Sequence, residues 1–98
     1  MRRTVLIRPE AEADLAAARD WYEDRLAGLG VEFGYEIDSV VSSLAERALA
    51  FPVIHREVRR ALIKRFPYGV FFVASDDLVV VLAVLHQARD PAAWKRRA

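Results

Sequence analysis

Residues 66–94, in the last third of the chain, read FPYG VFFVASDDLVVVLAVL HQARDPAAW and contain most of the information on the fold. Residues 70–75 and 78–86 are rich in β-branched and aromatic side chains, which favour strands. Asp76-Asp77 predicts a tight hairpin turn between these two strands. Pro67-Tyr68-Gly69 predicts a second turn, which leads back to a strand at residues 59–66. The sequence therefore predicts three consecutive antiparallel strands.

The last of these strands is apolar at every position from residue 78 to residue 85. A strand with one face in water alternates between apolar and polar side chains, so this pattern predicts that both faces are covered. Helices from the first half of the chain can cover one face. For the other face two interpretations stay open, namely the C-terminal residues 91–97 with their long Arg side chains, or a partner chain that docks on the strand.

A helical hairpin is predicted upstream of these strands. Residues 3–8 are expected to form a short strand that ends at Pro9, where the first helix begins. Gly28-Leu29-Gly30 ends this helix, and residues 31–49 form a second, antiparallel helix that stops before Pro52. Each helix has one apolar stripe, consisting of Ala11, Leu15, Ala18, Tyr22 and Leu26 in the first and of Phe33, Ile37, Val40, Val41, Leu44 and Ala48 in the second.

Length and composition limit the classes of protein to which the chain can belong. The 98 residues predict one domain over residues 1–98 with one modest core. Cysteine is absent, which excludes disulfides, thiolate nucleophiles and zinc sites built on cysteine. The apolar stretch after Arg2-Arg3 is too short for a signal peptide, and the apolar run at residues 70–85 is interrupted by polar residues. We therefore expect a soluble, cytoplasmic protein without a membrane partner.

Charge is distributed unevenly along the chain. The net charge is +1, but the Lys, Arg, Asp and Glu side chains of residues 1–50 sum to −4 and those of residues 51–98 sum to +5. In a compact domain this asymmetry favours an acidic helical side and a basic sheet side. The basic side would attract a polyanion or an acidic protein segment.

This order of parts resembles the RelE/ParE superfamily of bacterial toxins from type II toxin-antitoxin pairs. Trp21-Tyr22 in the first helix, Phe33 early in the second helix and the basic residues 59–66 carry the resemblance further, so that it covers nearly the whole chain. It implies an α+β fold with an N-terminal strand, an antiparallel helical hairpin packed on a small, mostly antiparallel sheet, and a short C-terminal helix or tail. RelE-type nucleases commonly carry a tyrosine beside the strand-end histidine, whereas here Gln87 follows His86. This departure indicates the ParE-like branch.

The ParE-like branch implies a toxin that binds and poisons DNA gyrase and is neutralised by a cognate antitoxin. Operator DNA would be reached only indirectly, through the antitoxin, and no cofactor or metal is implied. The basic side chains and the C-terminal tail are the predicted contacts with the target or the antitoxin, because phosphate or carboxylate groups attract them. These predicted contact residues are Arg56, Arg59, Arg60, Lys64, Arg65, Arg89, Trp94, Lys95, Arg96 and Arg97.

Two alternative functions stay open. A RelE-like, ribosome-dependent mRNA endonuclease would use His86 as general acid or base, with Arg60 or Arg65 stabilising the charge of the transition state. An inactive toxin scaffold would only bind its antitoxin. A structural role for His86 competes with catalysis, because its ring can cap the strand end and hydrogen-bond the backbone or Asp90. Trp94 is expected to pack back onto the domain.

Overall fold

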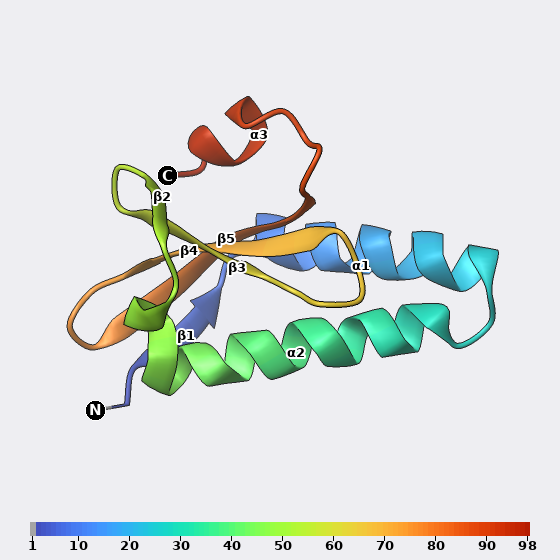
Figure 1. The fold of residues 1–98 in the computed structure, drawn as a ribbon, viewed down its shortest axis with the longest axis horizontal. Helices are drawn as coiled ribbons and strands as arrows, with labels where there is room; N and C mark the ends of the chain where they lie inside the picture. The colour runs from blue at the N-terminus through green and yellow to red at the C-terminus, as the bar shows by residue number, and fades with distance from the viewer. Residues whose placement is uncertain (1) are drawn as a thin grey trace.

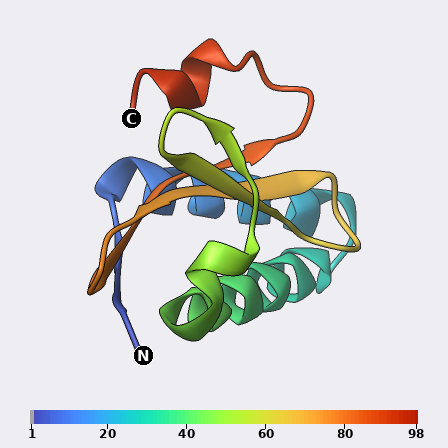
Figure 2. The same cartoon turned by 60° about the vertical axis from the view of Figure 1, so that its left-hand side comes forward.

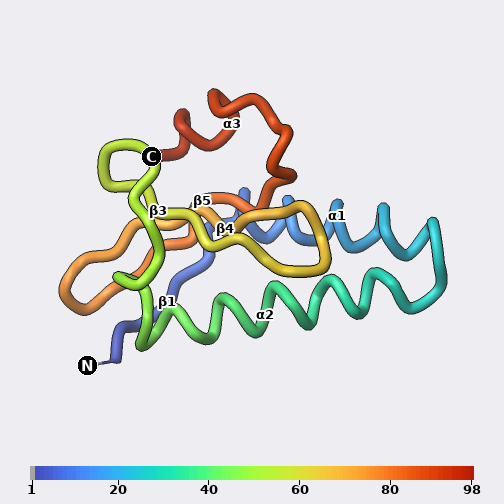
Figure 3. The backbone as a smooth tube through the Cα atoms, viewed as in Figure 1, coloured from blue at the N-terminus to red at the C-terminus, as the bar shows by residue number. Residues whose placement is uncertain are grey.

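The computed structural model describes residues 2–98, and their chain path runs strand, two helices, four strands, short helix (Figures 1 and 3). The elements are β1 (Thr4–Ile7), α1 (Pro9–Arg25), α2 (Leu29–Arg47), the 3₁₀ helix η1 (Ala48–Ala50), β2 (Val53–His55), β3 (Val58–Leu62), β4 (Tyr68–Ala74), β5 (Leu78–His86) and α3 (Ala92–Lys95). The strands form one five-stranded sheet in the order β1-β5-β4-β3-β2. β1 pairs with β5 in parallel, and every other pair is antiparallel. The predicted α+β class and the predicted order of elements are confirmed.

The connection between α1 and α2 is built from an acidic side chain and two glycines. The Glu23 carboxylate accepts hydrogen bonds from the backbone N–H groups of Gly28 (2.7 Å) and Gly30 (2.9 Å). These bonds lower the pKa of Glu23 and satisfy N–H groups at the start of α2. Gly28 has a φ of 90°, a conformation that favours glycine, and a Cβ at Gly30 would collide with the carbonyl oxygen of Arg19. The two helices therefore approach each other closely at this end.

Several predicted boundaries are wrong, and local hydrogen bonds explain the differences. α2 begins at Leu29 rather than residue 31, because Gly28 is the left-handed residue and Gly30 lies inside the helix. The strand predicted at 59–66 ends at Leu62. The Ile63 N–H donates to the Tyr68 carbonyl (3.1 Å), so the turn occupies residues 63–67, and β4 begins at Tyr68 instead of residue 70.

A short strand in the middle of the chain was not predicted. β2 has only three residues, and His55 is its last residue. β2 pairs with β3 through Val53 opposite Arg59 and His55 opposite Val58. Such a short segment has too few residues to show a strand pattern, so only its pairing with β3 reveals it. The hairpin of β4 and β5, with its turn at Asp76-Asp77, is confirmed.

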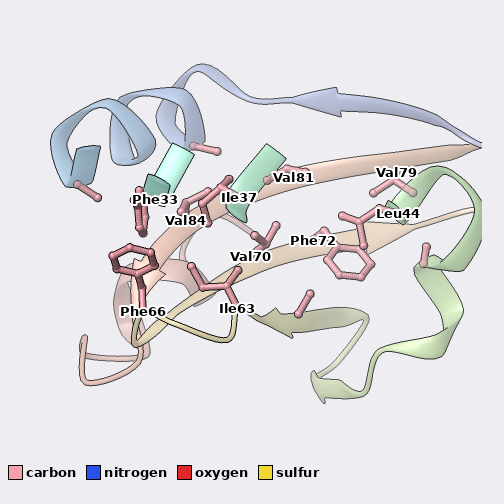
Figure 4. Packing of buried hydrophobic residues seen from close by; sticks show 14 residues of the cluster. Phe33, Ile37, Leu44, Ile63, Phe66, Val70, Phe72, Val79, Val81 and Val84 are labelled. Atoms are coloured by element: carbon pink, nitrogen blue, oxygen red, sulfur yellow. The ribbon is translucent and has the colours of Figure 1, made fainter. Parts of the chain in front are cut away.

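The main core lies between the helical hairpin and one face of the sheet (Figure 4). Phe33, Ile37 and Leu44 of α2 meet Val70, Phe72, Val79, Val81 and Val84 of the sheet, with Ile63 and Phe66 from the turn before β4 closing one end. We call this the helix-side cluster, and its other members are Ala11, Ala18, Ala48 and Ala61. The predicted apolar stripes of both helices supply its helical part, except that Leu26 lies just after the end of α1 and is 63% exposed.

A second, smaller cluster lies on the opposite face of the sheet. The C-terminal segment folds back over this face, and α3 lies on the other side of the sheet from α2 (Figures 1 and 2). This tail-side cluster consists of Val58, Phe71, Leu82, Ala83, Leu85, Ala93 and Trp94. Trp94 packs onto the domain as predicted, with its ring stacked on Phe71 at a centroid distance of 5.1 Å. Of the two interpretations for this face of β5, the structure therefore confirms cover by the C-terminal residues, which pack with the buried Leu82, Ala83 and Leu85.

No helix among residues 2–98 is long and apolar enough to cross a membrane.

Candidate functional site

The largest concentration of reactive and aromatic side chains lies where the β4–β5 hairpin opens. An irregularity between Phe71 and Phe72 shifts the pairing of the two strands by one residue on β5. On the side of the Asp76-Asp77 turn, Phe72 pairs with Val81. On the side away from the turn, Phe71 pairs with Ala83. The shift places Tyr68 directly opposite His86, with ring centroids 5.4 Å apart. Without it, the two-residue turn would have put Pro67 in that position.

A cavity of about 550 Å³ adjoins this pair of rings. Its wall combines α1, the turn before β4, the end of β5 and the segment that follows. The side chains that give it its chemical character are Asp14, Trp21, Tyr22, Tyr68, His86 and Arg89. Trp21, whose exposure the sequence left undecided, is 49% exposed, and the Arg25 guanidinium lies 3.7 Å from its ring centroid. Tyr22 packs against Phe33 and Phe66, so its place in the apolar stripe is confirmed.

The His86 ring is tied to the backbone. Its Nδ1 accepts a hydrogen bond from the Ala88 N–H at 2.9 Å, and the backbone N–H of Gln87 donates to the Pro67 carbonyl at 2.8 Å. A neutral imidazole that accepts at Nδ1 carries its proton on Nε2. Nε2 therefore cannot accept a proton from a substrate unless the bond to Ala88 breaks. The predicted backbone contact of His86 is present, but Asp90 caps the backbone N–H of Ala92 instead.

The two tyrosines of this cavity hold their protons more firmly than a tyrosine in water. Burial raises the pKa of Tyr68, and Asp14 raises it further against the opposing effect of Arg89. Burial also raises the pKa of Tyr22, with Tyr68 adding to the effect. Both phenols are therefore protonated at neutral pH and act as hydrogen-bond donors rather than as bases.

Asp14 is occupied by a partly buried ion pair. Its Oδ2 accepts from Nη1 of Arg97 at 2.5 Å and from the backbone N–H of Val84 at 3.0 Å, while its Oδ1 accepts from Nη2 of Arg97 at 3.2 Å. Nη1 of Arg97 also donates to the Leu82 carbonyl at 3.1 Å. These contacts join the last turn of the chain to α1 and β5. Arg97 is thus an anchor of the tail in this structure.

The three residues predicted for nuclease chemistry do not share a cavity. Arg65 lines a groove beside α2, where it pairs with Glu32 (3.3 Å) and Glu36 (3.8 Å). Arg60 pairs with Phe71 across the strands and lies beside Gly69, on the tail-side face. His86 faces the cavity beside α1. The structure therefore separates His86 from both arginines.

The remaining predicted contact residues fall into three places. Arg89 lines the His86 cavity, and Lys64 lines the groove with Arg65. Arg59 donates to the Phe51 carbonyl at 2.7 Å. Arg56, Lys95 and Arg96 line a cavity of about 600 Å³ between the β2–β3 turn and α3. Trp94 is 7% exposed, and its ring contacts Phe71 and His55.

Sequence reasoning missed Tyr68 and Trp21 as members of the His86 cavity. The Asp76-Asp77 turn was a usable signal for Tyr68, because counting back from the turn brings residue 67 or 68 level with His86. Nothing in the sequence indicates the irregularity that selects Tyr68. Among residues 2–98 there is also no group of three His, Cys, Asp or Glu side chains suited to holding a metal ion.

Comparison with protein families decides the affiliation of the chain. The model of a family described as the ParE toxin of the type II toxin-antitoxin system parDE matches residues 5–91. The chain belongs to the ParE toxin family. The match includes His86 and Arg89 and ends before α3, so the tail that carries Trp94 and Arg97 lies outside it.

Solved structures show the same fold as this ParE-family chain. One match is a chain of the structure described as the chromosomal ParDE toxin-antitoxin system from P. aeruginosa. The two chains superpose with a TM-score of 0.78 at 20% sequence identity, and the alignment covers 87% of this chain and 96% of the other. Ten chains of solved structures match significantly. Among curated proteins, none is significantly similar to this chain in sequence.

Proposed function

We propose that this ParE-family chain is a growth-inhibiting toxin that binds and poisons DNA gyrase in the cytoplasm, without being an enzyme itself, and that a ParD-type antitoxin neutralises it. The family match supports a toxin role. The bond from the Ala88 N–H to Nδ1 of His86 is the observation that favours binding over catalysis, because it leaves the strand-end imidazole without a free basic nitrogen.

We expect the contact surface of the toxin to use those predicted basic side chains that are exposed and form no ion pair within residues 2–98. Arg65 and Arg97 form ion pairs with carboxylates, and Arg59 donates a hydrogen bond to a backbone carbonyl. These three side chains therefore have fewer donor groups left to bind a partner. Arg56, Lys64, Arg89, Lys95 and Arg96 are exposed. We propose that these five side chains contact gyrase or an acidic segment of the antitoxin, and that Arg60 supports them. Operator DNA would be contacted by the antitoxin.

The first test is a gyrase assay with the purified, antitoxin-free protein. We expect inhibition of supercoiling together with trapped, cleaved DNA, and we expect the His86→Ala variant to keep this activity. Arg89→Gln should weaken the inhibition, whereas Arg2→Gln, which removes an exposed cation paired with Glu46, serves as the charge-matched control. Full gyrase activity in the presence of folded protein would refute the proposed target. In that case, growth inhibition by the same protein would indicate another target, and normal growth would indicate an inactive scaffold.

A second candidate function is cleavage of mRNA, because one cavity holds an imidazole, a phenol and a guanidinium. His86, Tyr68 and Arg89 line it together. In such a reaction the 2′-oxygen of a ribose would attack the adjacent phosphorus and the bond to the 5′-oxygen would break. His86 would take the 2′-proton after releasing Ala88, Tyr68 would protonate the leaving 5′-oxygen, and Arg89 would stabilise the phosphorane charge.

A ribosome-programmed mRNA cleavage assay tests this second candidate alongside the gyrase assay. If the nuclease function holds, Tyr68→Phe and His86→Ala should each lower cleavage by about a hundredfold or more. Cut mRNA with unaffected gyrase would overturn the gyrase proposal. Intact mRNA with trapped, cleaved DNA would leave His86 and Tyr68 with structural roles.

A further inference from the structure

The cavity between the β2–β3 turn and α3 contains a group of basic side chains. His55, Arg56, Lys95 and Arg96 converge on it, and Glu57, Val58, Val73, Ala92 and Ala98 complete its wall. Figure 2 shows the turn and the C-terminal segment lying next to each other, although almost forty residues separate them in the chain. The cavity is distinct from the His86 cavity, because the two share no lining residue.

Trp94 holds the two halves of this cavity in place. Its ring stacks on Phe71 of β4 and lies 5.9 Å from the His55 ring in an edge-on arrangement. Lys95 Nζ lies 5.8 Å from the centroid of the same indole. The indole therefore fixes the distance between β2 and α3, so that the cationic groups from the two elements face one space.

These cations have no carboxylate partner among residues 2–98. The ion pairs of this part of the chain use Arg2, Arg65 and Arg97 instead. Glu57 lines the cavity but forms no ion pair with a basic side chain of residues 2–98. Like charges in one cavity repel one another, so a bound anion would reduce this repulsion.

The backbone at Arg56 adds a second cost. Its φ is 52°, the single positive φ of a non-glycine residue among residues 2–98. A non-glycine residue in this region is disfavoured by about 1 kcal/mol or more, and glycine is the residue usually found at such a turn position. The chain nevertheless has an arginine here. Backbone strain of this kind concentrates at sites with a function.

The surroundings of His55 in this cavity change its pKa. Burial lowers the pKa of His55, and the positive charges of Lys95 and Arg56 lower it further. The ring is therefore neutral at neutral pH. An anion in the cavity would offset both positive charges and favour the protonated imidazole, which would then become an additional donor.

We propose that this cavity binds a phosphate group. The proposal shares Arg56, Lys95 and Arg96 with the contact surface proposed above, but it does not require gyrase to be the target. Phosphate fits better than carboxylate because the donors come from two directions, the β2–β3 turn and α3, and outnumber what two carboxylate oxygens can accept. A guanidinium fork and two further cations match the several oxygens and the higher charge of a phosphate. A nucleic acid backbone and a small phosphate compound both present this chemistry.

The experiment follows the two histidines by NMR, with His86 as the internal reference in the same molecule. Adding pyrophosphate at constant ionic strength is expected to raise the pKa of His55 by about half a pH unit or more, whereas the ring signals of His86 should not move. A short DNA duplex in place of pyrophosphate distinguishes the sources. A response to the duplex identifies a nucleic acid backbone, and a response to pyrophosphate alone identifies a small phosphate compound. An equal response of both histidines, an equal response to acetate, or no response would overturn the proposal.

Arg56→Gly separates binding from folding. Glycine suits the positive φ, so the unfolding midpoint should stay equal or rise, while affinity for pyrophosphate should fall about tenfold through loss of the guanidinium. Lys95→Gln, on the other wall, should weaken binding in the same direction. Arg2→Gln removes the same charge away from the cavity and should leave the affinity unchanged. Equal weakening by Arg2→Gln and Arg56→Gly would reduce the effect to net charge and refute a built site.

Discussion

The two faces of the sheet are covered in different ways. On the helix side, two long helices bury a continuous cluster that includes Phe33, Ile37, Leu44 and Phe72, each at most 1% exposed. On the tail side, one short helix covers the sheet mainly through Ala93 and Trp94, and Ile54, Val73 and Val80 are only partly buried. The helix side therefore forms the main hydrophobic core. The tail side is a thin layer whose position depends on a few contacts, and the basic cavity lies at its margin.

Phe72→Ala should have the largest effect, because it opens a hole in the helix-side cluster, where long helices cannot collapse to fill it. We expect a loss of about 3–5 kcal/mol in the free energy of unfolding. Phe71→Ala, one residue away on the tail side, is the matched comparison. It should cost less, because α3 can settle into the space. Urea unfolding of both variants measures the difference, and equal losses would show that the two faces are equally rigid.

Trp94→Ala should have the next largest effect. The indole is the main anchor of α3, so its removal is expected to cost about 2–3 kcal/mol and to release the tail. Hydrogen exchange should then speed up at residues 92–97 and leave the amides of α1 and α2 protected. A global loss of protection would mean that the tail is an integral part of the core.

Arg97→Ala should have a moderate effect. The Asp14 and Arg97 side chains are 13% and 20% exposed, between the surface and the buried case, so we expect a loss of about 1–2 kcal/mol. The same pair raises the pKa of Arg97. A double-mutant cycle with Asp14→Asn, read by urea unfolding, isolates the interaction of the two side chains. A coupling free energy near zero would show that the backbone contacts of α3 hold the tail without the ion pair.

A pH titration of stability should show the smallest effect. Because the pKa of folded His55 is lowered, the unfolded chain binds a proton at a higher pH than the folded chain does. The stability contributed by neutral His55 should therefore be present above the ordinary histidine pKa and decline as the pH falls from there through the lowered value. The difference in unfolding free energy between the wild type and His55→Gln should decrease in that window. A constant difference would show that His55 does not sense Lys95 and Arg56.

Most of the architecture could be predicted from the sequence, because periodicity and turn residues act locally. Apolar stripes indicated both helices, Asp76-Asp77 located the last hairpin, and the uninterrupted apolar strand at 78–85 showed that both faces are covered. The order of these parts, with the corner at residues 66–69 and the strand-end His86, was enough to suggest the RelE/ParE superfamily.

Which side chains meet could not be predicted from the sequence and depends on tertiary contacts. A one-residue irregularity in the β4–β5 pairing brings Tyr68 rather than Pro67 opposite His86, and no local pattern encodes it. β2 exists because β3 pairs with it, and the basic cavity exists because Trp94 folds back across the sheet. These features depend on contacts between residues far apart in the chain. Such contacts form only when packing repays the entropy of closing the intervening loops, and a sequence pattern of short range does not record them.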